Sequence, residues 1–131
     1  MPLVKIHMRD GKDKEHKKAV LDGVHKALVS AFRIPVNDRT LLLYEYDADH
    51  FDGRDLNFTI VEISAFSGRT KDMKKSLYQK IVENVSKTTN LQPTDIFIVL
   101  HDVPKDNWGI RGGQMASAVD LGVTVEAGKI Q

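Results

Sequence analysis

A proline follows the initiator methionine of this 131-residue chain, and removal of Met1 would leave Pro2 with a free secondary amine. An α-amino group titrates near pH ~8 in an unperturbed peptide, so modest desolvation or a neighbouring cation can leave it neutral and basic at physiological pH. Such an amine can take up and return protons. The ring also fixes φ, so a proline that leads directly into a strand is held with little freedom. The alternative is that Pro2 merely begins the chain.

The composition excludes several other kinds of site. The chain has no cysteine, which rules out disulfides, thiolate nucleophiles and cysteine metal sites. Nineteen Lys and Arg residues nearly balance eighteen Asp and Glu residues, and acidic residues are interspersed in the lysine clusters at 12–18 and 71–75. No aromatic residues alternate with those lysines. We therefore expect no nucleic-acid partner and no attraction to an anionic membrane.

Neither a membrane span nor a secretion signal is visible in the sequence. No apolar run approaches the roughly 20 residues that a membrane-spanning helix needs. The first residues, Pro-Leu-Val-Lys-Ile-His, lack the apolar core of a signal peptide. We expect a cytoplasmic protein without a membrane partner.

An internal repeat organises the chain. Five residues recur at a constant offset of 57 positions: Gly11, Lys14, Glu15, Lys17 and Lys18 match Gly68, Lys71, Asp72, Lys74 and Lys75. The apolar positions also match, with Val20, Leu21, Val24 and Leu28 opposite Leu77, Tyr78, Ile81 and Val85. Each apolar set has the i, i+1, i+4, i+8 spacing of an amphipathic helix. The repeat therefore predicts two helices, over about 13–32 and 70–88.

The residues at the ends of these segments fit helix boundaries. Asp13 and Thr70 are short oxygen-bearing residues that can satisfy free backbone amides at a helix N-terminus. Pro35 and Pro93 follow the two segments and prevent the helices from continuing.

Each predicted helix lies between two predicted strands. Alternating or short apolar runs predict strands over 3–8, 41–46, 59–65 and 96–100. A helical crossover of this length joins two parallel strands. Two such βαβ units side by side predict an α/β (α+β) fold, a four-stranded sheet with both helices on one face. The other face is also partly apolar, so we expect another subunit to cover it.

The repeat is asymmetric at Pro2. We expect one domain over 1–131, with repeats at about 2–46 and 59–102 and a tail at 103–131. Position 2 corresponds to Thr59, an internal residue. Only the first half can therefore carry a free amine.

Two further segments carry a family resemblance. The stretch from Val24 to Arg39 contains a Pro-x-Asn-Asp-Arg turn, and Asn107-Trp108-Gly109 lies in the tail. Together with Pro2 and the repeat, these segments resemble the tautomerase superfamily, and within it the fused two-βαβ type typified by malonate semialdehyde decarboxylase. The resemblance implies a homotrimer with Pro2 at the bottom of a pocket, a small oxo-acid substrate, and neither a metal nor an organic cofactor.

The resemblance also implies three catalytic residues, Pro2, Asp38 and Arg69. A guanidinium such as that of Arg69 can hold a substrate carboxylate bidentately and stabilise charge on an adjacent enolate oxygen. We expect Arg69 in the first turn of the second helix, where free amides also favour anions. An isolated arginine would otherwise be a solvated surface residue. Asp38 is either a carboxylate that binds water or tunes the amine, or a simple turn residue.

Two residues are candidates for substrate binding besides Arg69. Trp108 would line the pocket or else fill a core or a subunit contact. His25 flanks the apolar stripe of the first helix, so it would either face the substrate or pack in the core.

One position departs from the decarboxylase pattern. The decarboxylases that this chain resembles carry an Arg-x-Arg pattern before the second helix. At the corresponding positions this chain has Ser67-Gly68-Arg69, so the first arginine is absent. With one arginine, a carboxylate can be held but the neighbouring carbonyl is polarised less, which disfavours decarboxylation and dehalogenation. Arg39, Arg111 or a lysine of another subunit would have to substitute.

The chemistry that needs the fewest groups is keto-enol isomerisation of a 2-oxo acid such as phenylpyruvate. Pro2 would move the proton, and Arg69 would hold the carboxylate. Two alternatives stay open: decarboxylation or hydration of a 3-oxo acid such as malonate semialdehyde, and a non-enzymatic, cytokine-like interaction role.

Overall fold

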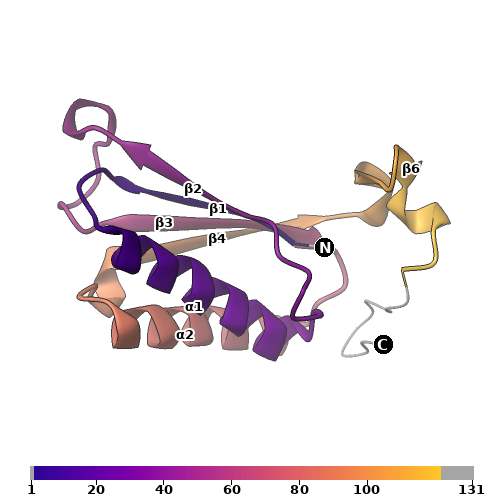
Figure 1. Ribbon diagram of the computed structural model, residues 1–131. Helices are drawn as coiled ribbons and strands as arrows, with labels where there is room; N and C mark the ends of the chain where they lie inside the picture. The colour runs from indigo at the N-terminus through magenta and orange to yellow at the C-terminus, as the bar shows by residue number, and fades with distance from the viewer. Residues whose placement is uncertain (1, 122–131) are drawn as a thin grey trace.

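The computed structural model describes residues 2–121, and its centre is a four-stranded mixed sheet in the order β2-β1-β3-β4 (Figure 1). The strands are β1 (Pro2–Arg9), β2 (Leu41–Tyr46), β3 (Thr59–Phe66) and β4 (Ile96–Val103). β1 is parallel to β2, β3 is parallel to β4, and β1 and β3 are antiparallel. The predicted pair of βαβ units is therefore confirmed, and the two central strands join them.

Two helices, α1 (Lys14–Phe32) and α2 (Lys71–Thr88), lie side by side on one face of this sheet (Figure 1). The predicted caps are confirmed, because the side chain of Asp13 accepts a hydrogen bond from His16 N and that of Thr70 accepts one from Met73 N. α1 ends at Arg33, whose φ of 53° is left-handed. The predicted helix bounds agree with the structure to within one residue.

The main core lies between the helices and the sheet. Alternate residues of the central strands point into it: Val4, Ile6 and Met8 from β1 and Val61, Ile63 and Ala65 from β3. The helices contribute Val20, Val24, Ala27, Leu28, Ala31, Phe32, Leu77, Ile81 and Val85. The strand period of two and the helix period of 3.6 thus bury a single layer of apolar side chains.

The opposite face of the sheet is uncovered in the single chain. Leu42, Tyr44 and Phe97 expose 45%, 38% and 49% of their surface there. Between them, Glu62 bonds two histidines, with 3.1 Å from its Oε1 to His7 Nε2 and 3.0 Å from its Oε2 to His101 Nε2. These hydrogen bonds lower the pKa of Glu62 below its usual range. The face combines exposed apolar side chains with a polar network at its centre.

The tail forms a small structure beyond the sheet. It contains β5 (Gly109–Ile110), β6 (Gln114–Met115) and short 3-10 turns. Phe66, Ile110 and Ala116 form a second buried cluster, with Trp108 and Leu121 packed against it.

β4 runs three residues past its predicted end. Its apolar run stops there, but Ser64, Ala65 and Phe66 of β3 continue to pair with it. Within residues 2–121, no helix is both long and apolar enough to span a membrane.

The contact between the two helices generates a prediction about stability. Gly23 is buried in α1, and a Cβ there would lie 3.0 Å from Val85 Cγ2 and 3.4 Å from Asn84 Cβ of α2. We expect Gly23→Leu to lower the free energy of unfolding by about 1–3 kcal/mol, because a larger side chain overpacks this contact. Urea unfolding of the two proteins measures this difference in the free energy of unfolding. The control is Lys26→Leu at an exposed position of α1, where a change within about 0.5 kcal/mol is expected. Equal effects of the two variants would contradict this packing.

Candidate active site

Strand pairing gathers three residues at one edge of the sheet. Pro2 pairs with Ala65 across β1 and β3, and Ala65 pairs with Asp102 across β3 and β4. Pro2 is buried and continues the alternation of Val4 towards the helices. Adjacent strands lie about 4.8 Å apart, so the backbones of Pro2 and Asp102 are roughly 10 Å apart on the same face. The start of β1 and the end of β4 therefore border one site.

Arg69 reaches the same edge from the segment between β3 and α2. Its Nη1 donates a hydrogen bond to Phe66 O at 3.0 Å, and its Cζ lies 4.7 Å from the ring centroid of Phe32. It precedes Thr70, the N-cap of α2, which corrects the expectation that it lies in the first helical turn. The Thr70 side-chain oxygen, not the arginine, accepts a hydrogen bond from a free amide of the first helical turn.

The guanidinium of Arg69 is buried and incompletely satisfied. The residue is 9% exposed, and its Nε is buried without a hydrogen-bond partner within residues 2–121. Buried polar groups are nearly always bonded, so an unpaired donor calls for a functional or structural reason. Here the Nε–H is the unsatisfied donor of a buried guanidinium.

Two carboxylates act on Arg69 through space. Burial lowers the pKa of Arg69 from its usual value, while the negative charges of Asp102 and Asp38 oppose this shift. Asp38 lies in the turn after α1, where its backbone N donates to Pro35 O at 3.0 Å. The charge of Asp38 thus acts on Arg69, as expected for two residues of one site. We call this end of the sheet, with Pro2, Arg69 and Asp102, the Pro2 edge.

Asp102 and Lys74 were not predicted from the sequence. Lys74 Nζ lies 2.9 Å from Asp102 Oδ2. This hydrogen bond lowers the pKa of Asp102, the Ser67 hydroxyl and the charges of Lys74 and Arg69 add to the lowering, and partial burial opposes it. The available signal was the repeat, because Lys74 and Asp102 occupy the positions of Lys17 and Glu45, which form the same ion pair at 2.9 Å.

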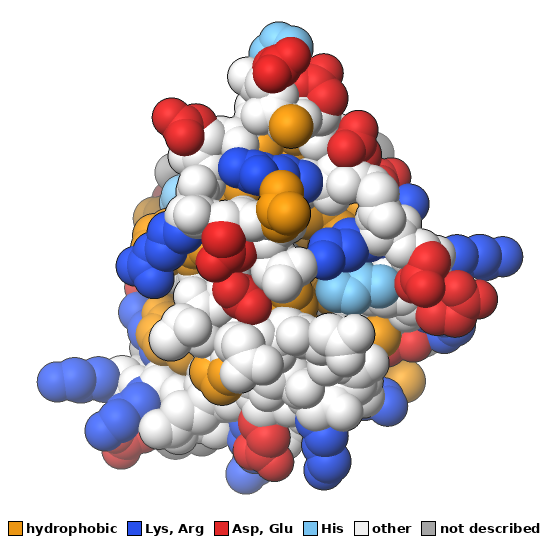
Figure 2. Space-filling model, turned by 90° about the vertical axis from the view of Figure 1, so that its left-hand side faces the viewer, with side chains coloured by type: hydrophobic (Ala, Val, Ile, Leu, Met, Phe, Trp, Pro, Cys, Tyr) orange, Lys and Arg blue, Asp and Glu red, His pale blue; other side chains and the backbone are white. Residues whose placement is uncertain are grey.

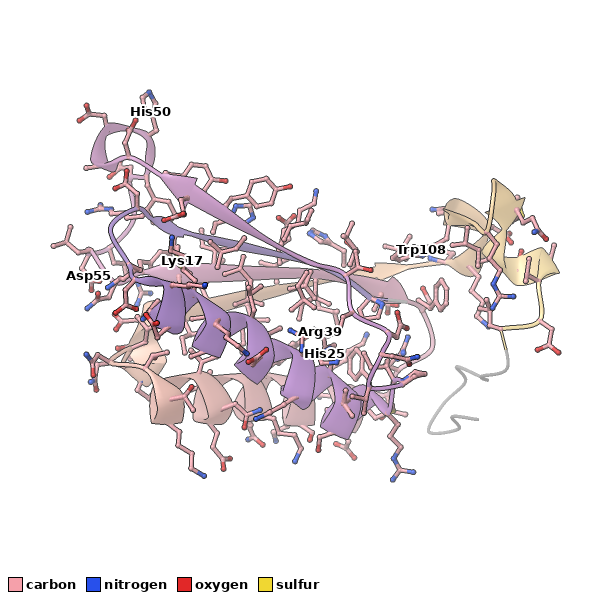
Figure 3. All side chains as sticks on the ribbon, viewed as in Figure 1. Lys17, His25, Arg39, His50, Asp55 and Trp108 are labelled. Atoms are coloured by element: carbon pink, nitrogen blue, oxygen red, sulfur yellow. The ribbon has the colours of Figure 1, made fainter. Side chains whose placement is uncertain are left out.

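The two predicted substrate-binding side chains take different positions. Trp108 lies where the tail leaves β4 (Figure 3), its ring centroid 5.1 Å from that of Phe66 at 80°, and its Nε1 donates to Val103 O. His25 is buried in α1, and its Nε2 lies 2.7 Å from Val36 O. Trp108 therefore borders the Pro2 edge, whereas His25 holds the turn that carries Asp38.

The two arginines considered as substitutes for the one absent at Ser67 are engaged elsewhere. Arg39 Nη2 lies 3.1 Å from Asp22 Oδ1 on α1, and Arg111 Nη1 donates to Asp120 O at 3.2 Å. Their bonds direct both side chains to other groups of the same chain. Lys74 instead pairs with Asp102, whose negative charge also acts on Arg69 through space.

The opposite end of the sheet has neither a terminal proline nor a buried arginine at the equivalent positions. At the offset of 57, Thr59 stands for Pro2 and Lys12 stands for Arg69, and Lys12 Nζ bonds Asn57 Oδ1. Figure 2 looks at the end of the molecule that lies on the left in Figure 1, where basic and acidic side chains are interspersed.

Among residues 2–121, no three His, Asp or Glu side chains are grouped to hold a metal ion.

The ion pair of Asp102 generates a prediction about pH. We expect Lys74→Met to raise the pKa of Asp102 towards its ordinary value, because its strongest hydrogen bond is lost. In the wild type, the pair stabilises the fold above the ordinary aspartate pKa and loses this effect as pH falls through the depressed value. NMR titration of the Asp102 carboxyl carbon measures the shift. Lys71→Met, at an exposed position of the same helix turn, is the control, and a pKa unmoved by Lys74→Met would contradict the geometry.

Comparisons with known proteins converge on one family. Two family models, each described as tautomerase enzyme, match residues 2–54 and 50–111. The 2-hydroxymuconate tautomerase of Comamonas testosteroni is 33% identical over 61 residues, which cover 47% of this chain and 92% of that protein.

Solved structures agree over most of the chain. A fused 4-OT described as a symmetric trimer has 26% identity and a TM-score of 0.79, covering 88% of this chain and 97% of that one. A malonate semialdehyde decarboxylase inhibited by 3-bromopropiolate has 25% identity and a TM-score of 0.74, covering 88% and 94%. The chain thus belongs to the tautomerase superfamily, in the fused form that carries two strand-helix-strand units in one polypeptide.

Proposed function

We propose that this protein is a tautomerase in which the amine of Pro2 moves a proton between carbon and oxygen of a 2-oxo acid such as phenylpyruvate. Membership of a family of tautomerase enzymes supports isomerase chemistry. The observation that carries the proposal is the shared edge, where buried Pro2 begins β1 beside the segment that leads to the buried guanidinium of Arg69.

The reaction needs one base and one cation. The neutral Pro2 amine, free once Met1 is removed, takes the proton from the carbon next to the carbonyl, and the electron pair of that C–H bond forms the enolate. Arg69 holds the carboxylate and stabilises the charge on the adjacent oxygen. The protonated Pro2 then returns its proton to that oxygen, so the enol forms without a net change in charge. This scheme uses neither a metal nor an organic cofactor.

Other residues at the edge support these two groups. Asp38 acts on Arg69 through space, and we assign it the role of holding a water or tuning the Pro2 amine. We assign Trp108 a place beside the substrate, because its ring packs against Phe66 and is partly exposed, which suits an aryl group. His25 contributes to substrate binding through the turn it holds at Val36.

We further propose a homotrimer. The apolar side chains Leu42, Tyr44 and Phe97 leave one sheet face uncovered, and a similar fused 4-OT is described as a symmetric trimer. Covering that face with identical subunits would bury these side chains.

A second candidate is decarboxylation or hydration of a 3-oxo acid, favoured by the similarity to malonate semialdehyde decarboxylase. Against it, Ser67 occupies the position of a second arginine. Release of carbon dioxide from malonate semialdehyde by the purified protein would support this activity, and no release from any 3-oxo acid would dismiss it.

The proposed base generates a kinetic prediction. We expect Pro2→Ala to lower kcat/KM for phenylpyruvate tautomerisation by about 10²- to 10⁴-fold, the usual contribution of a positioned general base. Absorbance of the enol follows the reaction. Arg69→Gln should raise KM and lower kcat, because it removes the carboxylate-binding cation, whereas Lys71→Ala on the exposed surface of α2 serves as the control. A Pro2→Ala variant with full tautomerase activity would contradict the proposal.

The proposed assembly generates a separate prediction. We expect Leu42→Asp to shift the protein from trimer towards monomer in sedimentation velocity, because a charge would be placed in an apolar interface. Lys26→Asp, on the exposed surface of α1, should sediment as the wild type does. A monomeric wild type, or an unchanged Leu42→Asp trimer, would exclude this face as the interface.

A further inference from the structure

Four charged groups at the Pro2 edge balance one another. Arg69 and Lys74 supply two positive charges, and Asp38 and Asp102 supply two negative ones. Of the two cations, Lys74 is bonded to the carboxylate of Asp102 at 2.9 Å, whereas Arg69 Nη1 donates to a carbonyl, Phe66 O, and its buried Nε has no hydrogen-bond partner among residues 2–121. Lys74 is therefore the cation of this edge that is neutralised by a bonded carboxylate.

We propose that Asp102 determines how many carboxylates a substrate of this site carries: by occupying Lys74, it leaves Arg69 as the cation for substrate, so the site selects monocarboxylates over dicarboxylates. This inference rests on the proposed function of the Pro2 edge and goes beyond it by naming the residue that sets substrate charge. Asp102 acts here as a specificity residue and not as a base.

The position of Asp102 gives it access to a bound ligand. It lies in the same cross-strand row as Pro2, two strands away and on the same face. The side chains of Lys74 and Asp102 are 29% and 41% exposed, so a ligand at this edge can reach both. Lys74 Nζ donates to Asp102 Oδ2 at 2.9 Å, and the charge of Arg69 contributes to the lowered pKa of Asp102.

The charge of Asp102 separates two classes of substrate. The second carboxylate of a dicarboxylic acid would meet the carboxylate of Asp102, and Lys74 could bind it only by giving up its present partner. An uncharged aryl or alkyl group meets no such repulsion. Removing the Asp102 charge would release Lys74 as a second cation and reverse this preference.

The repeat provides a matched control. Lys17 and Glu45 form the same ion pair at 2.9 Å at the equivalent positions, and Figure 3 shows Lys17 in the part of α1 far from Trp108. There the repeat places Lys12 and Thr59 instead of Arg69 and Pro2. The pair is thus part of the frame in both halves, and its proximity to Arg69 gives it the additional role at the Pro2 edge.

The test compares two unreactive acids of equal length, butyrate and succinate. Their affinities are measured by NMR titration of the folded protein, for wild type, Asp102→Asn, Glu45→Gln and the double variant Asp102→Asn/Lys74→Gln. We expect Asp102→Asn to raise the succinate-to-butyrate affinity ratio about tenfold, the effect of one unit charge a few ångströms away. Glu45→Gln should leave the ratio unchanged, and the double variant should return it to near the wild-type value.

A turnover measurement separates this inference from the proposed function. Tautomerisation of phenylpyruvate and of oxaloacetate is followed in the same variants, and Asp102→Asn should shift kcat/KM towards oxaloacetate. An unchanged ratio in folded Asp102→Asn, with phenylpyruvate still turned over, overturns the inference and leaves the function intact. A shifted affinity ratio without any turnover in the wild type supports the inference and overturns the function.

The remaining outcomes also decide the matter. If neither acid binds the wild type, the edge is not a carboxylate site and both proposals fall. If Asp102→Asn does not fold, Asp102→Ser removes the same charge, and the same shift is required of it. A shift that persists in the double variant would overturn the role of Lys74, because no released lysine would then explain it.

Discussion

The antiparallel pairing of β1 with β3 is the constraint on which the rest of the site depends. It places the first residue of β1 beside the end of β3, and the parallel pairing of β3 with β4 brings the end of β4 to the same edge. Pro2, Ala65 and Asp102 therefore form one row across the sheet. Arg69 follows the end of β3 in the chain and lies near this row. A register slip of one position would turn Pro2 to the opposite face of the sheet. The two βαβ units are thus joined in the way that makes one end of the molecule chemically distinct.

Electrostatics at this edge are held close to balance. Taking a guanidinium out of water costs several kcal/mol unless opposite charges and acceptors surround it. Arg69 has the Phe32 ring, the carbonyl of Phe66 and two nearby carboxylates, which together keep it charged in a buried position. Its buried Nε has no hydrogen-bond partner among residues 2–121. In the proposed function, a substrate carboxylate would add a further acceptor beside this guanidinium.

Local signals explain what could be predicted from the sequence. The helices and strands follow from periodicity, the caps Asp13 and Thr70 and the repeat, and their bounds agree closely with the structure. The small β5–β6 hairpin escaped prediction because two-residue strands carry no periodic pattern. The Lys74–Asp102 pair escaped because it joins residues 28 positions apart, and only the equivalent Lys17–Glu45 positions hinted at it. The role of Pro2 itself depends on a chemical event, removal of Met1, that folding does not report.

The reactivity of the Pro2 nitrogen is therefore the most direct test of the account. The purified protein is treated with 3-bromopropiolate, the compound that inhibits the similar malonate semialdehyde decarboxylase, and the added mass is located by peptide mapping. The account predicts one adduct per chain, on the nitrogen of Pro2 in an N-terminal peptide that lacks Met1. An N-terminal peptide that retains Met1, or one that stays unmodified while the adduct lies elsewhere, would contradict it.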